Sequence, residues 1–241
     1  MLQDWRLKTN RIDFISAYCD GWCERCAYTS RCSAFACQVA TAMCGDFEQG
    51  LELAVGVPRP VDREPEPVPI WLEELQNIEM TAQDRAELDR QEAARDARIE
   101  AAPLTMLATR HMRLAHRWLT AHRDRVSAAA DPIIADALAI VAHDCFLVGA
   151  KLRRAQDGRD RSRQGEDPHE DPVQNDWNGS AKVALISLDR SEAAWRVISQ
   201  ATRDPLAERL IQVLRDLRRA VDEEFPNAMS FVRPGFDEPW R

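Results

Sequence analysis

Apolar residues recur at helical spacing through most of the second half of the chain. Between residues 132 and 156 they form one stripe, made of Ile134, Leu138, Val141, Cys145, Val148 and Leu152. Residues 104–127, 179–202 and 205–221 show the same spacing of three and four. Such spacing places apolar side chains on one side of an α-helix. The pattern therefore predicts an all-α protein in which residues 103–225 form a helical bundle.

Helix start signals support these elements. The Asp-Pro pairs at 131–132 and 204–205 each put a capping carboxylate before a proline at the first helical position. Thr81 and Asp84 resemble a capping box, which predicts a helix from about residue 82 to 101. The long polar stretch 157–176 is expected to be a loop, so the helix after Pro132 should end near residue 156.

Composition divides the chain into five parts. Residues 1–55 are rich in cysteine, and residues 56–80 form a proline-rich acidic linker. Residues 81–102 are predicted to be a charged helix, residues 103–225 the bundle, and residues 226–241 an irregular tail. In the first part, residues 11–29 have helical spacing, and residues 30–47 are expected to form a second short helix that stops at Gly45.

The charge of the chain limits its partners. The net charge is −8, and nucleic-acid binding without sequence preference rests on Lys and Arg, so we expect none. The basic run Lys151–Arg163 is either a solvated helix end or a patch for phosphate or an acidic partner. No signal peptide or membrane span is evident, which predicts a cytoplasmic protein with reduced thiols.

The strongest chemical signal is four cysteines within fourteen residues. Cys19, Cys23, Cys26 and Cys32 follow the spacing C-x3-C-x2-C-x5-C, with Cys37 as a possible further ligand. Thiolates are soft ligands that suit iron–sulfur clusters and zinc. The spacing therefore predicts a metal site, a 4Fe-4S cluster first and zinc as the alternative. Reduced cysteines that hold no metal remain a third interpretation.

Two resemblances accompany this spacing. The stretch CERCAYTSRCSAFACQVA resembles the cluster motif of WhiB-like iron–sulfur proteins, which hold a four-iron cluster on short helices. That resemblance covers about 25 residues and implies Cys23, Cys26 and Cys32 as ligands, with Cys19 as the fourth. The whole chain also resembles an uncharacterised family of bacterial cysteine-cluster helical proteins that start Tyr-Cys-Asp-x-Trp-Cys-x-x-Cys and carry an Asn-Gly-Ser-Ala-Lys helix.

Three charged residues lie where apolar or capping residues are expected. Asp144 and Arg190 each fall within the apolar arc of a predicted helix, which predicts that they pair between the two helices. The pair is either structural, fixing helix register, or part of a catalytic or ligand-binding site. Lys182 follows Asn178-Gly-Ser180 at a predicted helix start, where it either binds an anion or belongs to an ordinary cap.

Three functions follow from these residues. The first is redox sensing or electron transfer through a cysteine-bound cluster, with an unidentified protein partner. The second is a zinc-stapled protein-interaction module, which uses the same cysteines without redox chemistry. The third is an enzyme with its site in the bundle around Asp144 and Arg190.

Overall fold

The computed structural model describes residues 10–56, 80–128, 131–165 and 171–237. In these residues it contains seven α-helices and four short 3-10 helices and no strand, so the all-α prediction is confirmed. The chain divides into two compact units. Asp13–Cys26 and Ala97–Arg241 make up one, here called the bundle unit, and Met1–Ile12 with Ala27–Asp96 make up the other, the hairpin unit.

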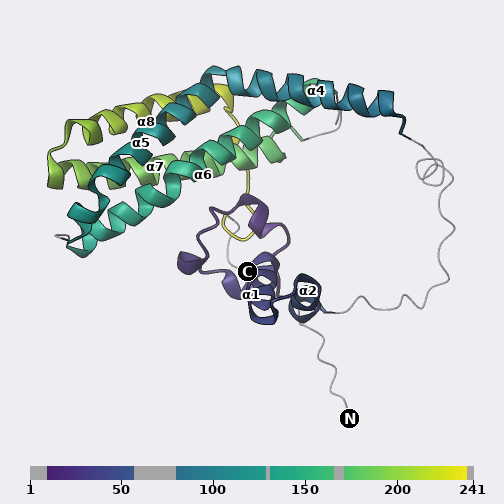
Figure 1. Ribbon diagram of the computed structural model, residues 1–241, viewed down its shortest axis with the longest axis horizontal. Coiled ribbons are helices and arrows are strands. Elements are labelled where there is room, and N and C mark those ends of the chain that lie inside the picture. Colours follow the sequence, from purple (N-terminus) through teal and green to yellow (C-terminus); the bar gives the residue numbers. More distant parts are fainter. Residues whose placement is uncertain (1–9, 57–79, 129–130, 166–170, 238–241) are drawn as a thin grey trace, which may run out of the picture. The chain divides into compact units, whose positions relative to one another are not determined.

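Four helices build the bundle unit, in which each helix packs against its neighbours along the chain. They are α5 (Pro103–Ala128), α6 (Pro132–Arg163), α7 (Asp176–Thr202) and α8 (Pro205–Glu224), shown in Figure 1. The helix α8 also packs on α5, which closes the bundle. This arrangement is a four-helix bundle with an apolar interior.

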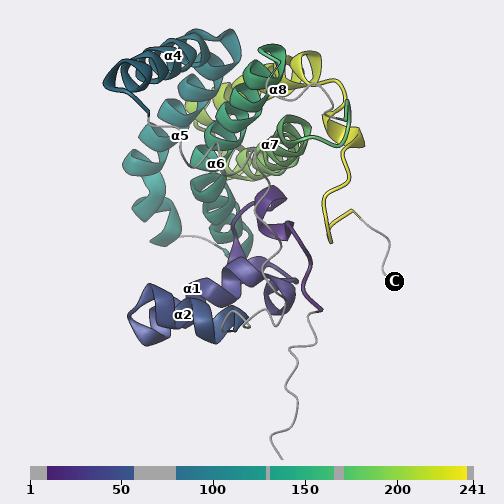
Figure 2. The same cartoon turned by 90° about the vertical axis from the view of Figure 1, so that its right-hand side faces the viewer.

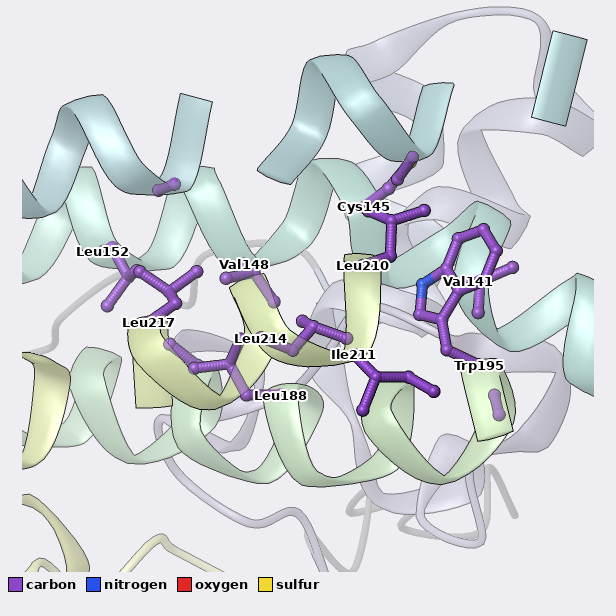
Figure 3. Close-up of a cluster of buried hydrophobic side chains, with 14 of the residues drawn as sticks. Val141, Cys145, Val148, Leu152, Leu188, Trp195, Leu210, Ile211, Leu214 and Leu217 are labelled. Atoms are coloured by element: carbon purple, nitrogen blue, oxygen red, sulfur yellow. The ribbon is translucent and has the colours of Figure 1, made fainter. Parts of the chain in front are cut away.

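The core of the bundle contains the predicted apolar stripe of α6, together with side chains of the neighbouring helices. Val141, Cys145, Val148 and Leu152 of α6 face Leu188 and Trp195 of α7 and Leu210, Ile211, Leu214 and Leu217 of α8 (Figure 3). Full burial of one such apolar side chain contributes about 1.5–3 kcal/mol relative to exposure.

The helix α6 is long and apolar enough to cross a membrane, by length and composition alone. Within the most apolar window of α6, 33 % is buried inside the bundle.

The helix starts follow the capping signals. Asp131 and Asp204 each accept a backbone N–H bond at the start of their helices, at 2.6 Å from Ile133 and 2.8 Å from Leu206. Each such cap stabilises a helix by about 1 kcal/mol. These two starts are confirmed.

The predicted end of α6 near residue 156 is wrong, because the helix continues to Arg163. Ion pairs stabilise the extra turns, with Arg161 bonded to Asp157 at 3.0 Å and Arg98 to Asp160 at 2.8 Å. α7 likewise begins at Asp176, two residues before the expected start, with Asn175 as its cap. Of the predicted loop, residues 166–170 lie outside the described residues.

The hairpin unit contains two short helices that pack on each other (Figure 2). α1 (Ser33–Cys44) ends at Gly45, which adopts a left-handed conformation (φ +71°), as the sequence predicts. The second helix, α2 (Phe47–Val55), starts from an Asp46 cap and has no counterpart in the sequence prediction. A Cβ atom at Gly50 would lie 2.5 Å from the Thr41 Cα, so close packing of the two helices requires glycine there.

The helix α4 spans Ala82–Ala101, as its capping box predicts. Thr81 and Asp84 bond to each other's backbone N–H groups at 3.0 and 3.1 Å. The predicted proline-rich linker falls almost entirely on residues 57–79, which lie outside the described residues. Past α8, the tail contains only one 3-10 turn, Ala228–Ser230, among its described residues.

Candidate functional site

The first cysteines lie on short turns, so the predicted helix over residues 11–29 is wrong. The structure has three 3-10 turns there, Ile15–Tyr18, Cys23–Arg25 and Thr29–Arg31. Between the first two, Gly21 adopts φ +72°, and the Asp20 carboxylate accepts the Trp22 backbone N–H at 3.1 Å. An Asp side chain that bonds the backbone two residues on forms a turn that competes with a helix. The local chemistry of Asp20-Gly21 therefore overrides the helical spacing.

The candidate metal ligands are divided between the two units. Cys19, Cys23 and Cys26 belong to the bundle unit, whereas Cys32 and Cys37 belong to the hairpin unit. All of them are partly exposed, and none forms a disulfide.

Two of the thiols share a single turn. The Cys26 backbone N–H donates to the Cys23 carbonyl at 3.2 Å, which closes the C-x-x-C stretch into a 3-10 turn. Cys32 caps α1, because its sulfur accepts the Phe35 backbone N–H at 3.4 Å. Among the described residues, no group of three or more His, Cys, Asp or Glu is placed to hold a metal ion. The four-cysteine ligand set therefore stays a prediction.

The residues between these cysteines attach the segment to the bundle unit. We call residues 17–25 the docking segment. Tyr18 lies with its ring 4.7 Å from that of Phe231, and its hydroxyl donates to Asp176 of α7 at 3.3 Å. The ring occupies the space over Gly179, where a Cβ atom would lie 2.4 Å from it. Glycine at this position of α7 is thus what admits the Tyr18 ring.

Asp20 makes the second attachment. Its carboxylate accepts a hydrogen bond from the Arg190 guanidinium at 2.6 Å, and the pair is only partly exposed. Burial raises the pKa of Asp20, but the hydrogen bonds from Arg190 and from the Trp22 N–H outweigh it and hold that pKa below its usual value. Asp20 is therefore ionised at neutral pH and bound to a fixed cation on α7.

Trp22 makes the third attachment, on α6. Its indole stacks on the His143 ring at 4.4 Å between centroids, and His143 Nε2 lies 3.0 Å from the Asp20 carbonyl oxygen. The Arg25 guanidinium covers the indole at 3.9 Å and pairs with Asp136 at 2.6 Å. Such cation–π contacts contribute about 0.5–1 kcal/mol each at exposed sites.

The basic run at the end of α6 also contributes. Lys151 and Arg154 both donate to the Ala17 carbonyl oxygen, at 3.2 and 3.3 Å. Burial lowers the pKa of Lys151. Two residues of the run therefore hold the start of the docking segment.

The structure places Asp144 and Arg190 against each other, as their positions on the two helical arcs predict. Arg190 forks onto both Asp144 oxygens at 2.5 and 2.9 Å, and the Ser191 hydroxyl donates to the same carboxylate at 3.2 Å. Asp144 is 0 % exposed. The ion pair therefore joins α6 to α7 through hydrogen bonds to both oxygens of the Asp144 carboxylate.

Lys182 holds the C-terminal tail. Its ammonium donates to the carbonyl oxygens of Phe231 at 2.6 Å and Met229 at 3.2 Å, and pairs with Asp237 at 2.8 Å. The Lys182 ammonium, which the sequence suggested as an anion-binding group, is therefore bonded to the tail of the same chain. The Asn-Gly-Ser-Ala-Lys stretch is thus used for docking, with Gly179 under Tyr18 and Phe231 and Lys182 on the tail carbonyls.

Replacing Gly179 by alanine is expected to displace Tyr18. The new Cβ would lie 2.4 Å from the Tyr18 ring and 2.8 Å from the Phe231 ring, far inside contact distance. We expect the free energy of unfolding to fall by about 1–2 kcal/mol in urea denaturation, because overpacking of this kind costs about 1–3 kcal/mol.

Gly149→Ala is the matched control for this change. Gly149 is also inside a helix, but a Cβ atom there would meet nothing within 4 Å. Alanine should stabilise that position by roughly 0.5–1 kcal/mol. Equal stabilisation of both variants would show that Tyr18 does not pack over Gly179.

Sequence reasoning missed the docking residues. The signal available was the alternation Tyr18-Cys-Asp20-Gly-Trp22-Cys, in which large or charged residues separate the cysteines.

Comparison of the chain with protein-family models, curated proteins and solved structures gives no match in any of the three. The function is therefore inferred from the residues of this chain.

Proposed function

We propose that the protein binds a metal centre, most readily an iron–sulfur cluster, through Cys19, Cys23, Cys26 and Cys32, and uses it to sense redox state or transfer electrons. The observation that carries this proposal is the docking segment. It attaches two partly exposed cysteines, Cys19 and Cys23, to the helical bundle, and Cys26 follows directly; none of the three is in a disulfide. A bound cluster would supply one-electron redox chemistry, and the chain would supply the thiolates and their anchorage.

Two features support a metal role over simple packing of cysteine. The C-x-x-C stretch forms a tight turn closed by the Cys26 N–H, and a short cysteine spacing of this kind is typical of thiolate metal ligands. Cys145, which does pack in the core, shows the contrast. Burial raises the pKa of its thiol to about 11, so it stays protonated, whereas the thiols at 19, 23 and 26 remain partly exposed.

Metal analysis of protein purified without oxygen tests the proposal. We expect a brown protein that contains iron and acid-labile sulfide, with broad absorption in the visible range. Cys26→Ser should remove the metal, because it deletes one thiolate of the proposed set. Cys44→Ser is the control, since Cys44 is exposed at the end of α1 outside that set, and it should keep wild-type metal content.

The outcomes separate the alternatives. A colourless protein with neither iron nor zinc would overturn the proposal. Zinc without iron would overturn the redox role and favour a zinc-stapled interaction module. Wild-type stoichiometry in Cys26→Ser would refute the ligand set.

A further inference from the structure

We propose that Asp20 is a positioning residue of the thiol site, because its ion pair with Arg190 fixes the backbone that carries Cys19 and Cys23. The metal-binding half of this inference rests on the proposed function. The docking half rests on contacts within the bundle unit alone.

The attachments alternate with the thiols. Tyr18 precedes Cys19, Asp20 follows it, and Trp22 precedes Cys23, so each thiol is next to at least one anchored residue. The Ala17 carbonyl is held as well, by Lys151 and Arg154. A backbone fixed at four places within six residues leaves its intervening thiols little freedom. Thiol side chains that are held in place beforehand bind a metal more tightly, because binding then costs less conformational entropy.

The guanidinium that holds Asp20 is itself held. Two of its nitrogens bond Asp144, and Asp144 is 0 % exposed and also accepts the Ser191 hydroxyl. Its third nitrogen, Nη1, remains to bind the Asp20 carboxylate at 2.6 Å. The buried pair between α6 and α7 therefore presents one oriented donor to the docking segment. This gives the pair a role in addition to joining two helices.

Docking and thiol ligation must then influence each other. If docking orders Cys19 and Cys23 for a ligand, the ligand stabilises docking by the same factor. Metal loading is thus expected to slow amide hydrogen exchange in residues 17–25. Loss of the Asp20 ion pair is expected to loosen the segment and weaken metal binding together.

Asp20→Asn tests the inference with little disturbance of the bundle. The amide oxygen of asparagine can still accept the Trp22 N–H that forms the turn, while the charge opposite Arg190 is lost. The Asp144–Arg190 pair remains. Asp13→Asn, which removes the same charge from an exposed position of the same unit, is the matched control.

Two measurements are made on each full-length variant. The first is the rate at which iodoacetamide alkylates Cys19 and Cys23 in reduced, metal-free protein, relative to the exposed Cys44 in the same molecule. We expect Asp20→Asn to raise this ratio about two- to fivefold, as loss of a partly exposed ion pair predicts, and Asp13→Asn to leave it unchanged. The second is iron or zinc affinity by competition with a chelator, which should weaken by a similar factor.

The two measurements separate this inference from the proposed function. Unchanged alkylation and unchanged metal affinity in Asp20→Asn would overturn the positioning role and leave metal binding intact. Faster alkylation in a protein whose wild type binds no metal would support positioning of the thiols and defeat the metal proposal. Faster alkylation in Asp13→Asn as well would overturn the inference, because general loss of charge would then explain the effect.

Discussion

Asp144→Ala is expected to lower the free energy of unfolding by about 3–5 kcal/mol in urea denaturation followed by tryptophan fluorescence. The substitution leaves the partly buried Arg190 guanidinium without two of its hydrogen bonds. Removing one partner of a buried ion pair typically costs about 3–5 kcal/mol, because the other charge stays buried without compensation. It also leaves the Ser191 hydroxyl without its acceptor in a buried position. The loss should exceed that of any exposed ion pair in the bundle.

Asp189→Ala provides the control, because Asp189 precedes Arg190 in α7 and pairs with Arg218 at an exposed position. Exposed pairs of this kind contribute about 0.2–1 kcal/mol, so Asp189→Ala should change stability little. Replacing both members by apolar residues, Asp144→Leu with Arg190→Met, should recover much of the loss, since an apolar pair leaves no charge buried. Similar small losses for Asp144→Ala and Asp189→Ala would contradict the buried-pair interpretation.

Elements whose signals are local could be predicted from the sequence. Asp131 and Asp204 before prolines, and Gly45 after α1, mark boundaries through backbone chemistry that operates within a few residues. Asp144 and Arg190 could be paired because each is a charged residue inside an apolar arc, and buried charges require partners. Their partner Asp20 could not, since the helical spacing of residues 11–29 gives no sign that this carboxylate lies beside Arg190.

The failures arise where contacts with distant residues act together with local turn and ion-pair chemistry. The end of α6 resembles a loop by composition, but ion pairs such as Arg98 with Asp160 support it as a helix. The turns over residues 15–25 have helical spacing, but their Tyr18 and Trp22 rings bind Gly179 and His143 of the bundle. The two ring contacts join positions more than a hundred residues apart, and the Arg98–Asp160 pair joins positions 62 apart, so no short window of the sequence contains both partners.

His111 is a core residue that we expect to make the bundle less stable in acid. It lies on α5 at 1 % exposure, and neither ring nitrogen has a hydrogen-bond partner within the described part of the chain. Burial lowers its pKa from 6.5 to about 4, so the folded protein keeps it neutral while the unfolded chain takes up a proton below pH 6.5. Stability is therefore fully present above pH 6.5 and is lost as the pH falls towards 4.

The pKa difference of His111 between the two states corresponds to about 3 kcal/mol at pH 4. His111→Leu is expected to abolish this part of the acid loss in urea denaturation at pH 7.5, 5.5 and 4.5. It should also stabilise the protein at neutral pH, because a buried polar atom without a partner costs about 1–3 kcal/mol. His116→Leu, on the exposed side of the same helix, should keep the wild-type acid dependence. An identical pH dependence in His111→Leu and wild type would mean that the fold accommodates a protonated ring at this position, which its apolar surroundings in the bundle oppose.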